Sequence, residues 1–234
     1  MVVAAILAGG KGSRMGSDLP KQFLETGGIP VIIRSINAFL SSSEVDNVII
    51  SVCADYYDYT KELVGQFVKT DKEIFIIHGG STRSDTLFGI VSFMKEKNIL
   101  DGSIVLTHDA VRPFINERII SENIEAAKKY GACNTCIPAV DTMLISDDGE
   151  FISSVPDRNH LFHAQTPQSF DAAKLYKLMS EMSEDVFNML TDGCSVFTYS
   201  GEPVYLVRGE SYNIKITFPD DIKRAESIIK EYYN

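Results

Sequence analysis

The chain is short of positive charge and has no long apolar run. It holds 22 Lys and Arg against 32 Asp and Glu, for a formal net charge of −10. Such acidity argues against nucleic acid or an anionic membrane surface as the main partner. No stretch reaches the roughly 18 apolar residues of a transmembrane helix, and residues 1–8 are too short, and lack the basic flank, for a signal peptide. We therefore expect a cytoplasmic protein that binds neither nucleic acid nor membrane.

Cysteine is also scarce, with four residues: Cys53, Cys133, Cys136 and Cys194. The C-x-x-C spacing of Cys133 and Cys136 occurs in redox motifs and in zinc sites. No second C-x-x-C pair completes a zinc site, and "GACNTCIPAV" has the apolar pattern of a strand. We interpret these cysteines as buried free thiols, which is a common environment for cysteine.

Apolar runs alternate along the chain with segments of helical spacing. The predicted strands are 2–8, 47–53, 73–80, 103–114 with a polar exit, 131–140, 202–210 and 212–217. The predicted helices are 29–40, 59–68, 82–97, 116–131 with Gly131 as C-cap, 172–182, and 219–233 with Pro219 at its start. This alternation predicts one α/β domain over residues 1–234, a Rossmann-like open and mostly parallel sheet with helices on both faces.

Residues 137–165 interrupt this alternation. They lack helical periodicity, and the turn sequence 147–149, Asp-Asp-Gly, stands between the apolar segments "TMLIS" and "FISSV". This pattern predicts an inserted β-hairpin arm. A protruding hairpin has exposed edges that a second subunit can cover, so we expect a homodimer formed through residues 137–165.

The glycine-rich loop "AILAGGKGSRMG" (5–16) follows the first predicted strand. Met15 stands where a dinucleotide fingerprint needs its third glycine, and glycine follows Lys11 where a Walker loop needs Ser or Thr. What remains is a longer loop with two cations, Arg14 and Lys21, which suits a triphosphate because its charge needs neutralising as it reacts. From these residues alone, a tight strand-to-helix turn with solvated charges stays open as an alternative.

Several motifs in fixed order resemble the sugar-phosphate nucleotidyltransferases, and within them the cytidylyltransferases. They are "LAGGKGSRMG…LPKQF", "GGSTRSDTL" (79–87), "THDAVRPF" (107–114), "AVDT" (139–142), "QTPQSF" (165–170), "LTDGCSV" (190–196) and "YNIKIT" (212–217). Two close families share this plan, the cytidylyltransferases of methylerythritol 4-phosphate and those of ribitol 5-phosphate. The resemblance covers nearly the whole chain.

The resemblance implies a reaction in which a polyol phosphate oxygen attacks the α-phosphorus of CTP and pyrophosphate leaves. Positioning and charge stabilisation would carry the rate. The implied catalytic cations are Arg14, Lys21 and Lys215, and the implied nucleotide contacts are Ala8, Gly9, Gly10, Gly12, Gly80, Ser81, Thr86 and Asp109. The implied polyol phosphate contacts are Arg112, Asp141, Thr142, Gln165, Thr166 and Thr191, with Asp192 beside them; Asp141 and Thr142 would reach over from the partner subunit.

Asp109 also stands out from its position alone, because it follows a buried strand at the edge where open α/β sheets bind ligands. A carboxylate there suits Mg²⁺, which we expect as the cofactor. Structural alternatives exist for the neighbouring residues: Arg83 as an ion-pair partner, Arg112 as a residue that orients its loop, and Lys215 as an ordinary strand-face lysine. We interpret His108 as structural, because an attacking phosphate oxygen is already ionised at neutral pH.

Val140 distinguishes the two families. In the methylerythritol enzymes the residue before the Asp-Thr pair is usually Arg or Lys, and Val140 removes that cation. The resemblance therefore favours ribitol 5-phosphate, which implies CDP-ribitol for teichoic acid or capsule synthesis and pairing with a reductase that supplies the substrate. The alternatives are the methylerythritol phosphate enzyme, an inactive nucleotide-binding module and, less favoured, a dehydrogenase, for which Asp55 is the available ribose-binding acid.

Overall fold

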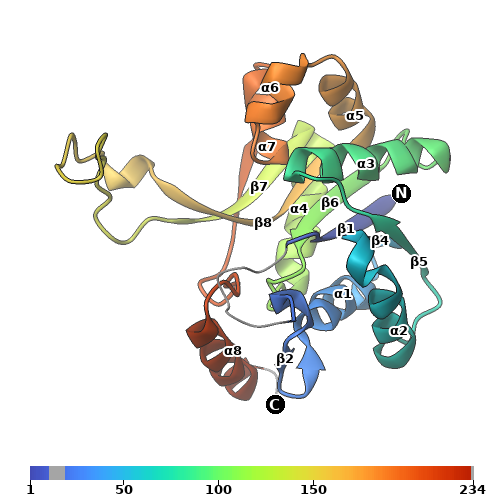
Figure 1. The fold of residues 1–234 in the computed structure, drawn as a ribbon. Coiled ribbons are helices and arrows are strands. Elements are labelled where there is room, and N and C mark those ends of the chain that lie inside the picture. Colours follow the sequence, from blue (N-terminus) through green and yellow to red (C-terminus); the bar gives the residue numbers. More distant parts are fainter. Residues whose placement is uncertain (11–18, 233–234) are drawn as a thin grey trace.

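The fold is a seven-stranded sheet with helices packed against both faces (Figure 1). The structure is a computed structural model that describes residues 1–10 and 19–232. The strands are β1 (Val2–Ala8), β4 (Asn47–Val52), β5 (Glu73–His78), β6 (Ile104–Asp109), β7 (Ala132–Pro138), β8 (Phe162–Asp171) and β9 (Tyr205–Arg208), with a separate pair β2 (Glu25–Thr26) and β3 (Ile29–Pro30). The helices are α1 (Val31–Ser41), α2 (Tyr57–Phe67), α3 (Arg83–Glu96), α4 (Glu117–Tyr130), α5 (Ala172–Ser180), α6 (Glu184–Met189), α7 (Gly193–Tyr199) and α8 (Pro219–Tyr232), with short 3-10 turns at Lys21–Phe23, Ala54–Tyr56 and Arg158–His160.

The sheet is mostly parallel, as the sequence predicts. Its order is β5-β4-β1-β6-β8-β7-β9, and β8 pairs antiparallel with both β6 and β7 while the other neighbours pair parallel. Side chains alternate across each strand, so neighbouring residues enter different cores. In β1, Ala4 and Ile6 face the core under α1, α2 and α4, whereas Val3 and Ala5 face the core under α3, α5 and α7.

Local signals set the ends of several helices where the sequence predicts them. Helix α4 is capped at its N-terminus by Asn116, whose side chain accepts from the Ile119 N–H at 2.9 Å, and at its C-terminus by Gly131, with φ +84°. Helix α8 begins at Pro219, which lacks an N–H that the first turn could not pair in any case. Within residues 1–10 and 19–232, no helix combines the length and the apolar character needed to cross a membrane.

The predicted strand at 212–217 is wrong, because this segment is an irregular loop that leads into α8. Ile214 and Ile216 alternate as they would in a strand, but they bury themselves in a small core with Val111 and α8. The Ile216 N–H donates to the Val111 carbonyl at 2.9 Å, and no strand pairs with the segment in the described sheet. Alternate residues of this segment are therefore buried although the segment forms no β ladder.

The arm predicted at 137–165 projects from the sheet (Figure 1) but is a regular hairpin only at its base. The β7–β8 ladder reaches Pro138 and Phe162, and beyond it one bridge joins Ile145 to Ser154. The predicted turn is present, with Gly149 at φ +79°. The regular hairpin of the prediction is thus corrected to an irregular arm over 139–161, while residues 162–165 belong to sheet strand β8.

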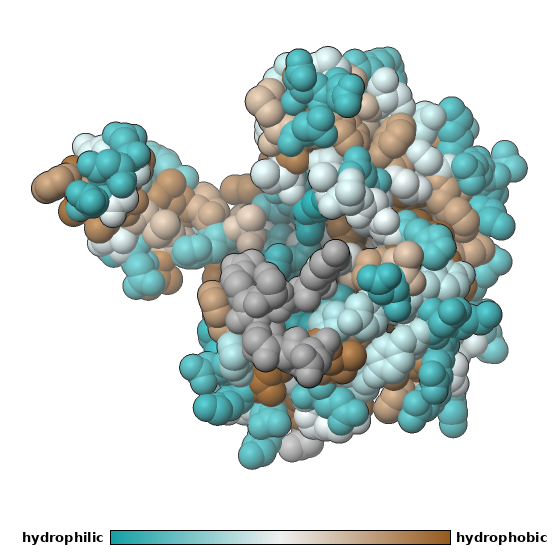
Figure 2. Space-filling model, in the orientation of Figure 1, coloured by the Kyte–Doolittle hydropathy of each residue, from teal (hydrophilic) through white to brown (hydrophobic). Residues whose placement is uncertain are grey.

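The arm carries large apolar side chains on its surface (Figure 2). Val140 is 77% exposed and Phe151 is 72% exposed. The other exposed apolar residues of the arm are Met143, Leu144, Ile145, Ile152 and Val155. Several large apolar side chains exposed on one segment are typical of an interaction surface.

The cysteines are free thiols, as predicted. Cys133 and Cys136 are buried in β7, and the Cys133 thiol donates to the Asn123 carbonyl. Burial raises the pKa of Cys133 to about 12 and also raises the pKa values of Cys136 and Cys194. Burial holds the thiols of Cys133 and Cys136 in the protonated form, which is unreactive. This environment does not suit a redox centre or a zinc site, because both use the thiolate.

Candidate active site

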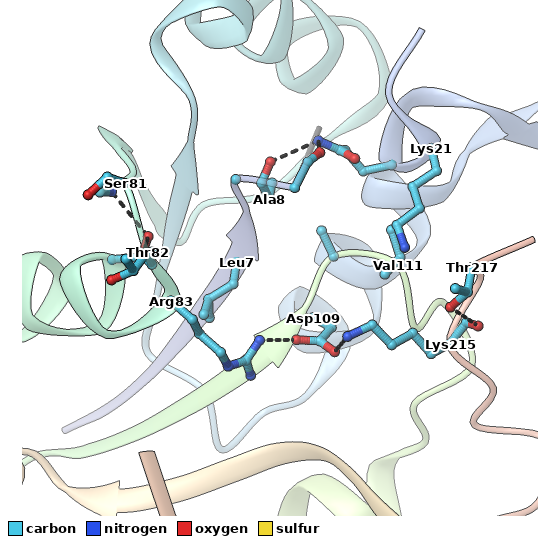
Figure 3. A pocket seen from close by; sticks show the side chains of 16 residues that line it. Leu7, Ala8, Lys21, Ser81, Thr82, Arg83, Asp109, Val111, Lys215 and Thr217 are labelled. Carbon is cyan, nitrogen blue, oxygen red and sulfur yellow. Dashed lines mark hydrogen bonds and ion pairs between the residues drawn. The ribbon is translucent and has the colours of Figure 1, made fainter. Parts of the chain in front are cut away.

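A cavity of about 420 Å³ lies over the carboxyl ends of β1 and β6 (Figure 3). After β1 the chain adds β4 and β5 on one side and then returns to place β6 on the other, so the cavity sits at the point where the strand order reverses. Open α/β sheets bind ligands at this point. The cavity is lined by residues 7–10, 21–22, 80–83, Thr86, 109–111, Lys215 and Thr217.

Asp109, at the end of β6, lies among three cations. Its Oδ1 is 2.6 Å from Nη1 of Arg83, and its Oδ2 is 2.9 Å from Nζ of Lys215 and 3.7 Å from Nε of Arg112. Burial alone would raise the pKa of this carboxyl, but the charges of Arg83 and Lys215 outweigh it and hold the pKa well below its usual range. The ion-pair interpretation of Arg83 is confirmed, and the pair opens into the cavity (Figure 3).

The N-terminus of α3 forms one wall of the cavity. Thr82 caps the helix by accepting from the Asp85 N–H at 3.0 Å, and the Asp85 carboxylate accepts from the Thr82 N–H at 2.9 Å. Gly80 is required here because a Cβ would lie 2.2 Å from the Asp85 Cβ. The predicted Thr86 supports this turn, since its hydroxyl accepts from the Gly80 N–H at 3.1 Å. The positive end of the helix dipole favours an anion at this wall.

Gln22 supports the opposite wall, at the start of the glycine-rich loop. Its side chain is buried, and Nε2 donates to the Ala8 carbonyl at 2.8 Å and to the Gly10 carbonyl at 3.0 Å. Neighbouring Lys21 lines the cavity, as predicted. The predicted residues Gly12 and Arg14 lie outside the described residues.

A buried polar network supports Asp109 from behind. The Thr166 hydroxyl accepts from the Asp109 N–H at 3.1 Å and lies 3.0 Å from Nδ1 of His108, while Nε2 of His108 lies 2.9 Å from the Arg112 carbonyl. A carbonyl only accepts, so the His108 proton resides on Nε2 and Nδ1 accepts from Thr166. Burial lowers the pKa of His108 to about 4, which keeps the ring neutral. The structural interpretation of His108 is confirmed.

The predicted site residues separate into two groups. Those brought together at the cavity are Ala8, Gly9, Gly10, Lys21, Gly80, Ser81, Thr86, Asp109 and Lys215. Those that do not line it are Arg112, Asp141, Thr142, Gln165, Thr166 and Thr191. The side chains of Arg112, Gln165 and Thr166 are buried in internal contacts, whereas Asp141 and Thr142 are exposed on the arm and Thr191 is exposed before α7.

Among the wall residues that were not predicted, three are polar and uncharged: Gln22, Thr82 and Thr217. Gln22 and Thr82 stand inside the quoted motifs "LPKQF" and "GGSTRSDTL", and Thr217 ends "YNIKIT". Their position in the sequence beside a predicted cation or turn is the feature that could have indicated them as site residues. Nothing in the sequence shows which backbone groups their side chains reach.

The donor set for a divalent cation is small. Among the described residues, no three His, Cys, Asp or Glu side chains are grouped so that they could hold a metal. Asp109 is the carboxylate that lines the cavity. Mg²⁺ commonly binds through one or two carboxylates together with substrate phosphates and waters, so Asp109 fits as one ligand of an ion that arrives with a nucleotide.

Comparison with known proteins assigns a family. Residues 2–231 match the family model of 2-C-methyl-D-erythritol 4-phosphate cytidylyltransferase. A solved 4-diphosphocytidyl-2C-methyl-D-erythritol synthase from Anaerococcus prevotii is similar over 98% of this chain and 96% of that one, at 30% identity and a TM-score of 0.79. The 2-C-methyl-D-erythritol 4-phosphate cytidylyltransferase of Thermus thermophilus is similar over 98% and 100%, at 25% identity and a TM-score of 0.74. The Francisella tularensis enzyme, at 23% identity and a TM-score of 0.78 over 97% of this chain and 98% of that one, shares the fold.

Proposed function

We propose that this chain, which belongs to the 2-C-methyl-D-erythritol 4-phosphate cytidylyltransferase family, transfers CMP from CTP to ribitol 5-phosphate. The reaction forms CDP-ribitol and releases pyrophosphate. The observation that supports the nucleotidyl transfer is the set of cations at the cavity, in a chain whose net charge is −10. Lys21, Arg83 and Lys215 all face a space bounded by the positive end of α3.

In this proposal a phosphate oxygen of the polyol phosphate attacks the α-phosphorus of CTP, and the bond to the pyrophosphate oxygen breaks. Lys215 and Lys21 stabilise the charge that develops on the α-phosphoryl and the leaving group. No side chain needs to remove a proton, because the attacking phosphate is already ionised. The neutral, buried His108 then supports the backbone beside Asp109.

We extend the proposal to Mg²⁺, with the Asp109 carboxylate as its protein ligand and the triphosphate as the source of further oxygens. The ion supplies charge neutralisation along the triphosphate. Arg83 and Lys215 each pair with one of the two carboxylate oxygens in the structure, and a carboxylate oxygen has a second lone pair with which it can bind a metal ion.

The choice of polyol phosphate depends on Val140. This side chain is 77% exposed on the arm, so its apolar character is not required by the core of the chain itself. A cation remains nearby, because Nη1 of Arg158 donates to the Val140 carbonyl at 3.2 Å. Methylerythritol 4-phosphate is the second candidate, since the matched family and the similar Thermus thermophilus enzyme carry its name, and the Anaerococcus prevotii structure is named as a diphosphocytidyl-methylerythritol synthase.

We also propose that two copies pair through the arm. A second copy would cover the exposed apolar side chains of residues 139–161 and would bring Asp141 and Thr142 toward the partner's cavity, where their own chain does not place them. Burial of these side chains would favour the pair, because the removal of apolar surface from water is the main favourable term in most protein association.

The test is pyrophosphate release with CTP, Mg²⁺ and each polyol phosphate in turn. We expect kcat/KM with ribitol 5-phosphate to exceed that with methylerythritol 4-phosphate at least about tenfold, which is about 1.4 kcal/mol of discrimination. Val140→Arg, which adds a cation, should lower this ratio. Faster turnover of methylerythritol 4-phosphate by the unaltered chain would overturn the substrate choice.

Lys215→Ala tests the proposed chemistry. It should lower kcat by about 10²- to 10³-fold, because it removes a charge that stabilises the transition state. Lys223→Ala is the control, since Lys223 is an exposed lysine of α8 outside the cavity. Equal activity of the two variants would remove Lys215 from the catalytic groups.

A further inference from the structure

Lys215 lies on an irregular loop, so something other than a β ladder must fix its position. The segment 209–217 lacks regular structure, and Lys215 itself is 42% exposed at its side chain. On its C-terminal side the Ile216 N–H is tied to the Val111 carbonyl. On its N-terminal side Ile214 packs into the small core with Val111 and α8, and the nearest hydrogen bond to another segment comes from Asn213, two residues away.

Asn213 is fully buried and joins its loop to β8. Its Nδ2 donates to the Thr166 carbonyl at 2.9 Å and approaches Oε1 of Gln165 at 3.3 Å. Both partners accept, because Nε2 of Gln165 is already used to donate to the Glu210 carbonyl at 2.8 Å. The Asn213 amide is therefore oriented by its surroundings, and a flipped amide would place its oxygen against two acceptors.

The same residue is held through its backbone. The Asn213 carbonyl accepts from Nη1 of Arg112 at 2.8 Å, and Arg112 is the buried cation 3.7 Å from the Asp109 carboxylate. Thr166, whose carbonyl Asn213 contacts, also accepts from the Asp109 N–H through its hydroxyl. Asn213 thus connects the loop of Lys215 to Arg112 and Thr166, two of the residues that contact Asp109.

We propose that Asn213 is a positioning residue that fixes Lys215 in register with Asp109 and the triphosphate site. It touches no substrate and acts through the backbone of its loop. A buried amide suits this role because it supplies the donors that a neighbouring strand would otherwise supply, without adding charge beside Asp109. The proposal rests on the proposed function for the catalytic role of Lys215.

The first test separates positioning from general stability. Asn213→Ala should lower kcat by about 10²-fold with little change in the KM for CTP, because a displaced catalytic group costs rate more than ground-state binding. The matched control is Asn123→Ala. Asn123 is equally buried and donates to the Ile119 carbonyl and the Thr135 hydroxyl away from the cavity. A similar kcat loss in the control, at similar unfolding free energy, would overturn the proposal.

The second test asks whether Asn213 acts through Lys215. In a Lys215→Ala background, Asn213→Ala should lower the residual kcat less than about twofold, because the group that it positions is gone. The proposal would be overturned if Asn213→Ala lowered kcat by the same factor in the Lys215→Ala background as in the parent protein. The comparison also holds if Asn213→Ala lowers the stability of the fold, because the loss of stability is the same in the parent and in the Lys215→Ala background.

A third readout does not depend on activity. Lysine-directed reductive methylation, followed by peptide mass spectrometry, reports the accessibility of Lys215, which is ion-paired with Asp109 in the structure. Asn213→Ala should raise the labelling rate of Lys215 several-fold and leave exposed Lys223 unchanged. Unchanged labelling of Lys215 overturns the positioning proposal. If Asn213→Ala speeds the labelling of Lys215 but Lys215→Ala keeps full activity, the positioning proposal is supported and the proposed catalytic role of Lys215 is wrong.

Discussion

At the scale of single residues, one buried carboxylate organises the site. Asp109 has a side chain only 7% exposed, and it pairs with cations from three separate segments of the chain. Burying a carboxylate is costly unless it is paired, and removing one partner of a buried pair commonly costs about 3–5 kcal/mol. In the proposed function the same cations also contact the triphosphate, and Asp109 keeps them together before the nucleotide binds.

His108 gives a prediction about pH at this scale. Its pKa is about 4 in the folded chain, against an ordinary value of 6.5, so between these values the unfolded chain binds the proton more readily. The free energy of unfolding should therefore fall as the pH drops from about 6.5 toward 4, and the loss from this ring should be about 2 kcal/mol at pH 5. Urea unfolding of the parent and of His108→Gln at pH 7.5 and pH 5 measures it. Equal pH dependence in both proteins would contradict the prediction.

At the scale of elements, the two walls of the cavity are built differently. The wall from α3 is fixed by local bonds, since Thr82 and Asp85 cap each other within one turn. The wall from 209–217 has no comparable local structure and depends on side chains that reach β8 and the exit of β6. The wall that carries Lys215 is thus the one whose geometry depends on distant residues.

The arm supplies the prediction at the element scale. Phe151→Asp combined with Val155→Asp places charges where the proposed second copy covers apolar surface, so the mass in solution should fall from dimer to monomer. Light scattering measures the mass, and pyrophosphate release should fall with it because Asp141 and Thr142 would no longer reach a partner. Tyr199→Asp is the control and should leave the mass unchanged, because Tyr199 is an aromatic residue of α7 that is also largely exposed, at 60%. A parent protein that is monomeric and fully active would refute pairing through the arm.

At the scale of the whole molecule, two cores sandwich a sheet whose strand order reverses at the site. This arrangement places the ends of β1 and β6 side by side, with Leu7 opposite Asp109. The reactivity of the cysteine thiols measures how well the packing of helices against the sheet excludes solvent. Cys133 and Cys136 are enclosed by the sheet, and burial raises the pKa values of both thiols and of Cys194, so little thiolate forms at neutral pH.

A thiol titration tests this closure. With an aromatic disulfide reagent at pH 8, at most Cys53 should react within minutes in the native protein, because reaction needs an accessible thiolate. All four thiols should react after unfolding without a reductant. Fast native reaction of two or more thiols, or fewer than four after unfolding, would show an open structure or a disulfide.

The amino-acid sequence by itself determined the alternation of strands and helices and the ends of helices such as Gly131 and Pro219. These features follow from local patterns, because burial periodicity and backbone preferences act over a few residues. The same reasoning placed 212–217 in a strand, since periodicity reports burial and not the presence of a pairing neighbour. The sequence also indicated Lys21 and Asp109 by their positions beside a predicted loop and strand, whereas Lys215 was indicated only by the family resemblance.

The tertiary structure alone decided which groups the side chains reach. Arg83 meets Asp109 across 26 positions of the chain, and Arg112 meets the Asn213 carbonyl across 101. It also turned Thr166 and Gln165 inward, to hold Asp109 and the loop of Lys215. Such contacts depend on strand order and on the path of each connection. A buried polar group must be paired by whatever the fold brings within about 3 Å, and no local pattern carries that information.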